Sequence, residues 1–228
     1  MDSTQGSSPY SILKRFARPR VAAEVCDLCA QEIAPEHRHL LERSTRQILC
    51  ACDACGTLFS AQADTPYRLV PRRTRFLPNF HMSDAQWDDL LIPVDMAFFF
   101  YSSAELRTMA FYPSPAGPTE SLLTLEAWEE VAHDNPVLAE MQPDVEALLV
   151  NRLKGARDYY LAPIDKCYEL VGLIRANWRG LSGGPEVWKE IDNFFTRLKA
   201  QAGVKEPEAR DLGPASSPDP QPLDQPHA

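Results

Sequence analysis

The chain has 228 residues, 44% of them hydrophobic, and a formal net charge of −9. This composition is sufficient for a packed core, and the negative charge argues against general nucleic-acid binding. No apolar run reaches the roughly 18 residues of a transmembrane helix, and the N-terminus lacks the apolar centre of a signal peptide. We therefore expect a cytoplasmic protein.

Changes in composition divide the chain into four parts. Residues 1–20 are expected to form a mobile basic arm, and residues 21–63 a small module that contains five of the six cysteines. Residues 64–202 carry apolar patterns of strand and helix length. Residues 203–228 are rich in proline and almost lack large apolar side chains, which predicts a disordered tail.

The expected elements begin inside the cysteine module. Residues 46–52 predict a strand that leads into a cysteine turn, and Gly56 is expected to need a positive φ. Two short strands around a basic turn are expected over residues 67–80. Ser83 then begins a helix with a capping box, because Gln86 lies three residues further on.

The following segment predicts a β-hairpin, formed by residues 96–101 and 108–112, and then a proline-rich loop over residues 113–121. Thr124 is expected to cap a helix that runs to about Ala132.

The last third predicts another strand pair, over residues 147–153 and 159–164, although the first of these also fits a helical face. Asp165 is expected to cap a helix with a buried stripe. Pro185 is expected at the first position of the last helix. The whole pattern predicts an α+β protein: a small zinc-ribbon or rubredoxin-like module, followed by a domain of mixed antiparallel sheet and helices.

Two Cys-x-x-Cys pairs carry the chemical signal of the chain. Cys26 and Cys29 form one pair, and Cys52 and Cys55 form the other. Each tight turn places two thiolates on one side, and two facing turns supply four sulfurs at the corners of a tetrahedron. In a reducing compartment this spacing favours a metal over disulfides. We expect Zn²⁺, with one iron as the alternative, because CDACG has the glycine of a rubredoxin knuckle and CDLCA lacks it.

Three neighbouring residues are second choices as ligands. Cys50 lies two residues before Cys52, on the same face of an extended strand, and could replace it, although packing is the simpler role. His37 or His39 could complete a site of three cysteines and one histidine, or could tune the thiolates from outside.

The remaining signals are weaker. A basic cluster could dock an acidic partner, and it comprises Arg68, Arg72, Arg73 and Arg75. The backbone N–H groups of Ser182, Gly183 and Gly184 precede a helix and could bind an anion, but the Gly-Lys-Ser/Thr ending of a phosphate-binding loop is missing. HExxH is absent from the sequence, and we expect a protein that is not an enzyme.

Several longer motifs are spread over residues 12–200: CDLC with EHRHLL, LCACDAC, IPVDMAFFF, FYPSPAGPTESLL, PDVEALLVNR, PIDKCYELVGLIR and WRGLSGG. Together they resemble an uncharacterised bacterial family of unknown function whose genes tend to lie in clusters for high-affinity, oxygen-tolerant nickel–iron hydrogenases. The resemblance implies that the four paired cysteines are the ligands, and it supplies no catalytic residues. It implies an accessory protein that contacts a hydrogenase subunit or maturation factor. A rubredoxin-like electron carrier for the hydrogenase is the alternative.

Overall fold

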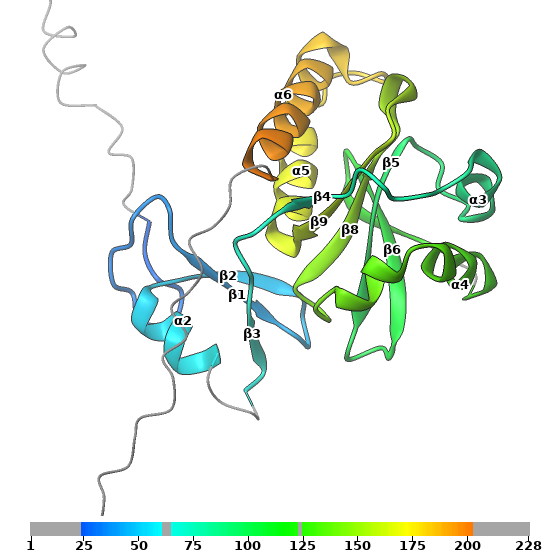
Figure 1. Ribbon diagram of the computed structural model, residues 1–228. Coiled ribbons are helices and arrows are strands. Elements are labelled where there is room, and N and C mark those ends of the chain that lie inside the picture. Colours follow the sequence, from blue (N-terminus) through cyan, green and yellow to red (C-terminus); the bar gives the residue numbers. More distant parts are fainter. Residues whose placement is uncertain (1–23, 61–64, 123–124, 203–228) are drawn as a thin grey trace, which may run out of the picture.

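The computed structural model describes residues 24–60, 65–122 and 125–202, without the side chain of Leu125. The arm expected over residues 1–20, the tail expected over residues 203–228 and the cap expected at Thr124 lie outside the described residues. The described chain contains two antiparallel sheets and their helices (Figure 1). The predicted α+β class is thereby confirmed.

The smaller sheet belongs to the cysteine module. It has the order β2-β1-β3 and consists of β1 (Arg38–Glu42), β2 (Gln47–Ala51) and β3 (Tyr67–Leu69). The short helix α2 (Asp53–Ser60) follows β2 directly. Since β3 pairs with β1, the expected boundary between residues 63 and 64 cuts through this sheet.

The larger sheet has six strands in the order β4-β9-β8-β5-β6-β7, and every neighbouring pair is antiparallel. Its strands are β4 (Arg75–Phe76), β5 (Met96–Ser102), β6 (Arg107–Ser114), β7 (Gly117–Ser121), β8 (Glu146–Asn151) and β9 (Asp158–Pro163). The predicted hairpin over residues 96–112 and the predicted strand pair around residue 155 are confirmed.

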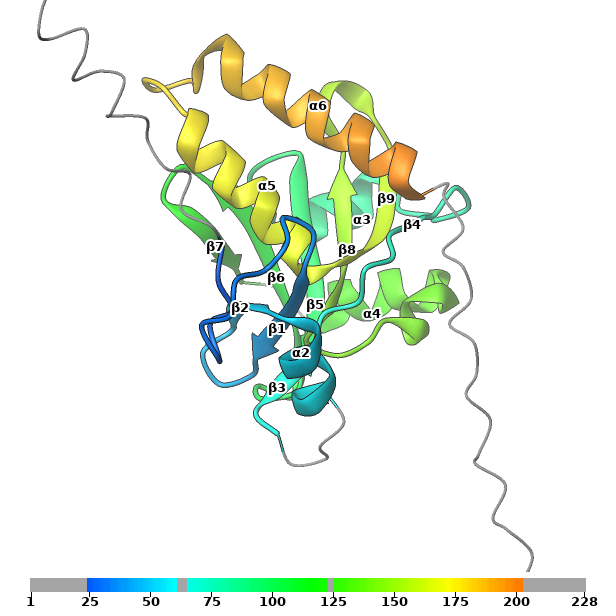
Figure 2. The ribbon, with the colours of Figure 1, turned by 90° about the vertical axis from the view of Figure 1, so that its left-hand side faces the viewer.

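Helices cover both faces of the larger sheet (Figures 1 and 2). One face carries α5 (Ile164–Asn177) and α6 (Gly184–Ala202), and the other carries α3 (Asp84–Asp89) and α4 (Leu125–Asp134). Two short 3₁₀ helices, Pro136–Glu140 and Leu153–Gly155, lie in connections. Adjacent strand residues therefore enter different cores, as Phe98 does on the α5 side and Phe99 on the α3 side. This coverage explains why the central strands are apolar without alternation.

Two local predictions about strands need correction. The two short strands of residues 67–80 do not form a hairpin, because β3 joins the smaller sheet and β4 the larger one. The expected loop over residues 113–121 is mostly strand: β6 extends to Ser114, and β7 pairs with it. Prolines do not prevent this, since Pro113 and Pro118 face each other across the pair, where β7 is the sheet edge.

Two helix starts were predicted with different success. The capping box is confirmed, because Ser83 accepts from the Gln86 N–H and the Gln86 side chain accepts from the Ser83 N–H. Asp165 does not cap its helix: Pro163 occupies the N-cap position, and Asp165 lies in the first turn. Its carboxylate is therefore free to contact another part of the chain.

The cysteine module packs onto the larger sheet on the side that carries α5. Leu41 and Val70 of the module are buried in the same core as Phe98 and Leu170. The tip of the β1–β2 hairpin also makes contact, because a guanidinium nitrogen of Arg46 lies 3.0 Å from the sulfur of Met109. None of the described helices combines the length and apolarity needed to cross a bilayer.

Candidate metal centre

The first cysteine pair lies in a tight turn before β1. Val25 bridges to Glu32 across the turn, the Cys26 N–H donates to the Gln31 carbonyl at 2.8 Å, and Ala30 adopts a φ of +60°. The left-handed residue thus follows Cys29 in the first turn. Gly56, for which a positive φ was expected, lies inside α2 instead, so that expectation was wrong.

The first turn is fixed to β2 by Asp27. Its backbone N–H donates to the Cys50 carbonyl at 2.9 Å, and its carboxylate accepts from the Cys50 N–H at 2.6 Å. These two bonds hold the first cysteine turn against the strand that leads into the second.

The second cysteine pair lies at the start of α2. Cys52 lies between the end of β2 at Ala51 and the start of α2 at Asp53, and Cys55 lies in the first turn of the helix. The Cys55 N–H donates to Sγ of Cys52 at 3.4 Å, and the Gly56 N–H donates to the Cys52 carbonyl at 2.8 Å. The helical turn therefore points both thiols toward the first pair.

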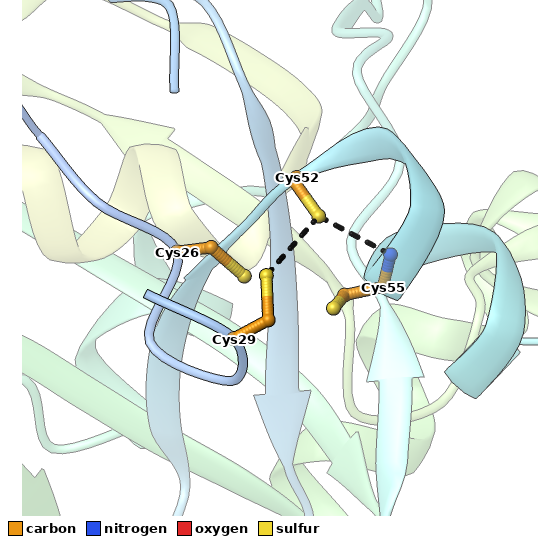
Figure 3. A group of neighbouring side chains, drawn as sticks. All are labelled: Cys26, Cys29, Cys52 and Cys55. Carbon is orange, nitrogen blue, oxygen red and sulfur yellow. Dashed lines mark hydrogen bonds between the residues drawn. The ribbon is translucent and has the colours of Figure 1, made fainter. Parts of the chain in front are cut away.

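The four sulfurs converge from these two turns, as Figure 3 shows. All four Sγ atoms lie within 4.8 Å of one another, and Sγ of Cys29 is 3.7 Å from Sγ of Cys52. A metal with bonds of about 2.3 Å to four tetrahedral sulfurs would separate each pair by about 3.8 Å. All six cysteines of the chain are free thiols. The donor set and spacing thus fit a four-thiolate metal site, and zinc and iron fit it equally.

Cys26 and Cys55 of the candidate centre differ in acidity. Burial raises the pKa of Cys26, but the N–H groups around it, first that of Cys52, lower this pKa to about 6. Burial and the neighbouring thiols raise the pKa of Cys55 to about 12. Without metal, Cys26 is therefore deprotonated more readily than Cys55, and a metal bound by Cys55 must displace its proton.

The second-choice ligands form a group of their own. One ring nitrogen each of His37 and His39 and Sγ of Cys50 lie within 4.8 Å of one another. Asp165 contacts this group, because its Oδ2 lies 2.7 Å from Nδ1 of His39. No local pattern marks Asp165 as a site residue, because 126 positions separate it from His39.

The four arginines of the predicted basic cluster lie in different surroundings. Arg72 and Arg73 line a cavity beside the two histidines, whereas Arg68 lines another cavity with Tyr67, and Arg75 pairs with Glu140 at 2.6 Å.

The Ser182–Gly184 turn lies between α5 and α6. Gly183 and Gly184 have φ values of +86° and +76°, and the Ser182 carbonyl accepts from the Trp188 indole at 3.2 Å. Val187 and Trp178 fill the space where a Cβ of Gly183 would lie. These contacts explain the glycine at this position by the geometry of the turn.

The fold and the cysteines define an α+β protein with a four-cysteine candidate metal site near its N-terminus. Residues 25–202, which make up more than half of the chain, match a family of unknown function, DUF5947, and the chain belongs to that family. No curated protein matches the chain, and no solved structure matches it.

Proposed function

We propose that this protein holds one zinc ion through its two cysteine pairs and acts as an accessory protein in the assembly or function of a nickel–iron hydrogenase. In this proposal it works in the cytoplasm through protein–protein contacts and catalyses no reaction itself. The convergence of four free thiols within 4.8 Å is the observation that carries the metal assignment.

A structural role for the metal follows from the closed ligand shell. Four protein ligands leave zinc no position for a substrate or a reactive water. The surrounding sheet is small, with strands of five, five and three residues. Such a sheet has little stability of its own, so a metal that joins the two turns would supply much of it.

The proposed partner follows from the family resemblance, and the module offers a surface for it. Val25 is 48% exposed beside the first cysteine turn, and Leu58 is 55% exposed three residues after Cys55. Apolar side chains exposed beside a rigid centre would contribute contact area to a protein partner.

One iron in place of zinc would make the protein a rubredoxin-like electron carrier. Two observations favour this second candidate: Cys29 is exposed, and the Cys55 N–H donates to a ligand sulfur. Colour distinguishes the two candidates. Ferric thiolate absorption that dithionite bleaches reversibly would support iron. A colourless protein that contains zinc by elemental analysis would eliminate the electron-carrier candidate.

The ligand assignment is tested by Cys52→Ser. We expect cobalt-substituted Cys52→Ser to lose the intense thiolate-to-cobalt absorption of a four-thiolate site, because one corner of the tetrahedron is gone. The matched control is Cys50→Ser, which should retain that absorption. The opposite result for the two variants would make Cys50 the ligand.

The partner assignment is tested by a pull-down from cells that express the hydrogenase. We expect the wild-type chain to recover a hydrogenase subunit or maturation factor, and Cys52→Ser to recover less because its module is no longer held in shape. Recovery of neither class of protein by the wild-type chain would contradict the proposed role.

A further inference from the structure

A second group of metal-binding side chains lies on the smaller sheet. β1 and β2 pair in a register that places His39 opposite Cys50, and side chains of paired residues lie on the same face. His37 precedes His39 by two positions and so shares its face. The register alone therefore brings two imidazoles and one thiol together.

Hydrogen bonds fix which ring nitrogen of each histidine is free. Nδ1 of His37 lies 2.9 Å from the Ala34 carbonyl and 3.4 Å from a Glu24 carboxylate oxygen. Both partners are acceptors, so Nδ1 carries the proton and Nε2 keeps its lone pair. In the same way, the Asp165 carboxylate accepts from Nδ1 of His39 at 2.7 Å and leaves Nε2 of His39 as an acceptor.

One of these two acceptors, Nε2 of His37, has no hydrogen-bond partner in the described part of the chain. The His37 side chain is only 9% exposed, and its Nε2 is buried without a hydrogen-bond partner. Leaving such a group unsatisfied costs about 1–3 kcal/mol. The ring of His39 is its edge-to-face neighbour, with 4.8 Å between the ring centroids, and supplies no proton to it.

We propose that His37, His39 and Cys50 bind a second divalent transition-metal ion, separate from the four-cysteine centre. Two imidazole nitrogens and one thiolate suit zinc or cobalt. Asp165 then acts as a positioning residue, because a carboxylate on the far nitrogen of a ligating histidine fixes its tautomer and orientation. This site does not depend on the proposed partner.

Three protein ligands leave one coordination position open, in contrast to the closed shell of the first centre. Both histidines and Asp165 line a cavity of about 410 Å³, together with Arg72, Arg73 and Lys166. Arg73 lies 4.0 Å from Glu146 and Lys166 pairs with Glu169 at 2.8 Å, while Arg72 has no ion pair among the described residues. Glu36 also lines this cavity beside the cations, so we expect the exogenous ligand at the open position to be a water molecule or a small anion.

The two centres share a structural connection. The backbone of Cys50 makes both hydrogen bonds to Asp27 in the first cysteine turn, and Cys52 follows two residues later. Occupancy of the second site would thus hold β2 in the position from which it presents Cys52.

A cobalt titration of the full-length, reduced, metal-free chain tests the proposal. We expect wild-type protein to bind two equivalents of Co²⁺, and His39→Ala and Cys50→Ser to bind one. The matched control is His81→Ala, which removes an exposed histidine outside the group and should leave two equivalents. One equivalent in the wild type, or two in both ligand variants, would overturn the second site.

Two further measurements do not depend on removing a ligand. Asp165→Asn should lower the affinity for the second Co²⁺ roughly 10- to 100-fold and leave the affinity for the first unchanged. The variant keeps all three ligands and alters only the hydrogen bond that orients His39. Azide should change the visible spectrum of the second cobalt, which has an open position, and not that of the first. An unchanged second affinity in Asp165→Asn, or a second spectrum insensitive to azide, would contradict the proposed geometry. Circular dichroism of each variant verifies that the fold is retained.

Discussion

At position 56, contact with a neighbouring side chain accounts for the glycine, and the backbone conformation does not. It lies in α2 with an ordinary φ, so a turn does not require glycine there. A Cβ on Gly56 would lie 2.7 Å from Cδ of Arg38. A shift of Arg38 away from this Cβ would disturb the hydrogen bond that its Nε donates to the Asp53 carboxylate at 2.9 Å. The glycine thus lets β1 and α2 approach each other behind the four cysteines.

We expect Gly56→Ala to lower the free energy of unfolding by roughly 1 kcal/mol. Overpacking costs about 1–3 kcal/mol, and the better helix propensity of alanine recovers up to about 1 kcal/mol. Urea denaturation of wild type and variant under identical conditions measures the difference.

The control is Gly172→Ala in α5, where no atom lies within 4 Å of the new Cβ. This variant should gain up to about 1 kcal/mol. Equal stability changes in the two variants would show that the contact with Arg38 is unimportant.

At the scale of elements, α3 is attached to the larger sheet by one buried arginine. The Arg152 side chain is only 5% exposed, and its guanidinium lies 5.2 Å from the centre of the Trp87 ring and donates to Asp84. Arg157 also donates to Asp84, at 2.6 Å. The first turn of α3 therefore carries a carboxylate held between two guanidinium groups.

This arrangement predicts a dependence of stability on pH. The charge of Arg157, and then that of Arg152, holds the pKa of Asp84 below its ordinary value. A depressed carboxyl pKa stabilises the fold above the unfolded pKa of about 3.9, and the contribution disappears as pH falls through the lower, folded pKa. Asp84→Asn should therefore be less stable than wild type at pH 7, and the difference should shrink below about pH 4.

Thermal unfolding of both proteins across this pH range measures the effect. A difference that stays constant from pH 7 to pH 3 would show that the carboxylate charge does not stabilise α3. Asp88→Asn is the matched control, because Asp88 lies in the same helix and forms no ion pair with the described residues.

At the scale of the whole molecule, the cysteine module and the larger sheet differ in how they are stabilised. The larger sheet has apolar cores on both faces, whereas the smaller sheet contributes only Leu40, Leu41, Ala51 and Val70 as deeply buried side chains other than cysteine. The module should therefore depend on metal, and the larger sheet should not.

Metal removal tests this difference by hydrogen exchange. After chelation under reducing conditions, we expect amide protection over residues 24–60 and 67–69 to fall close to that of an unfolded chain, while β5 and β8 stay protected. Cys52→Ser should show the same pattern without a chelator. Equal loss of protection in both sheets would mean that they unfold as one cooperative unit.

Local patterns in the sequence predicted the elements whose cause is local. Cysteine spacing marked both turns, Ser83 with Gln86 marked the start of α3, and the apolar stripe of α5 predicted the burial of Cys167, Leu170 and Ile174. Each of these signals depends on residues within one or two turns of one another.

Contacts between residues far apart in the chain decided which sheet each strand joins and which side chains meet. The sequence by itself determined the four-cysteine candidate centre and the α+β class, because ligand spacing and apolar periodicity are properties of neighbouring residues. Only the tertiary structure assigned β3 and β4 to different sheets and brought Asp165 to His39. The physical reason is that burial and sheet register join residues far apart in the chain, and no local pattern encodes which partner each will meet.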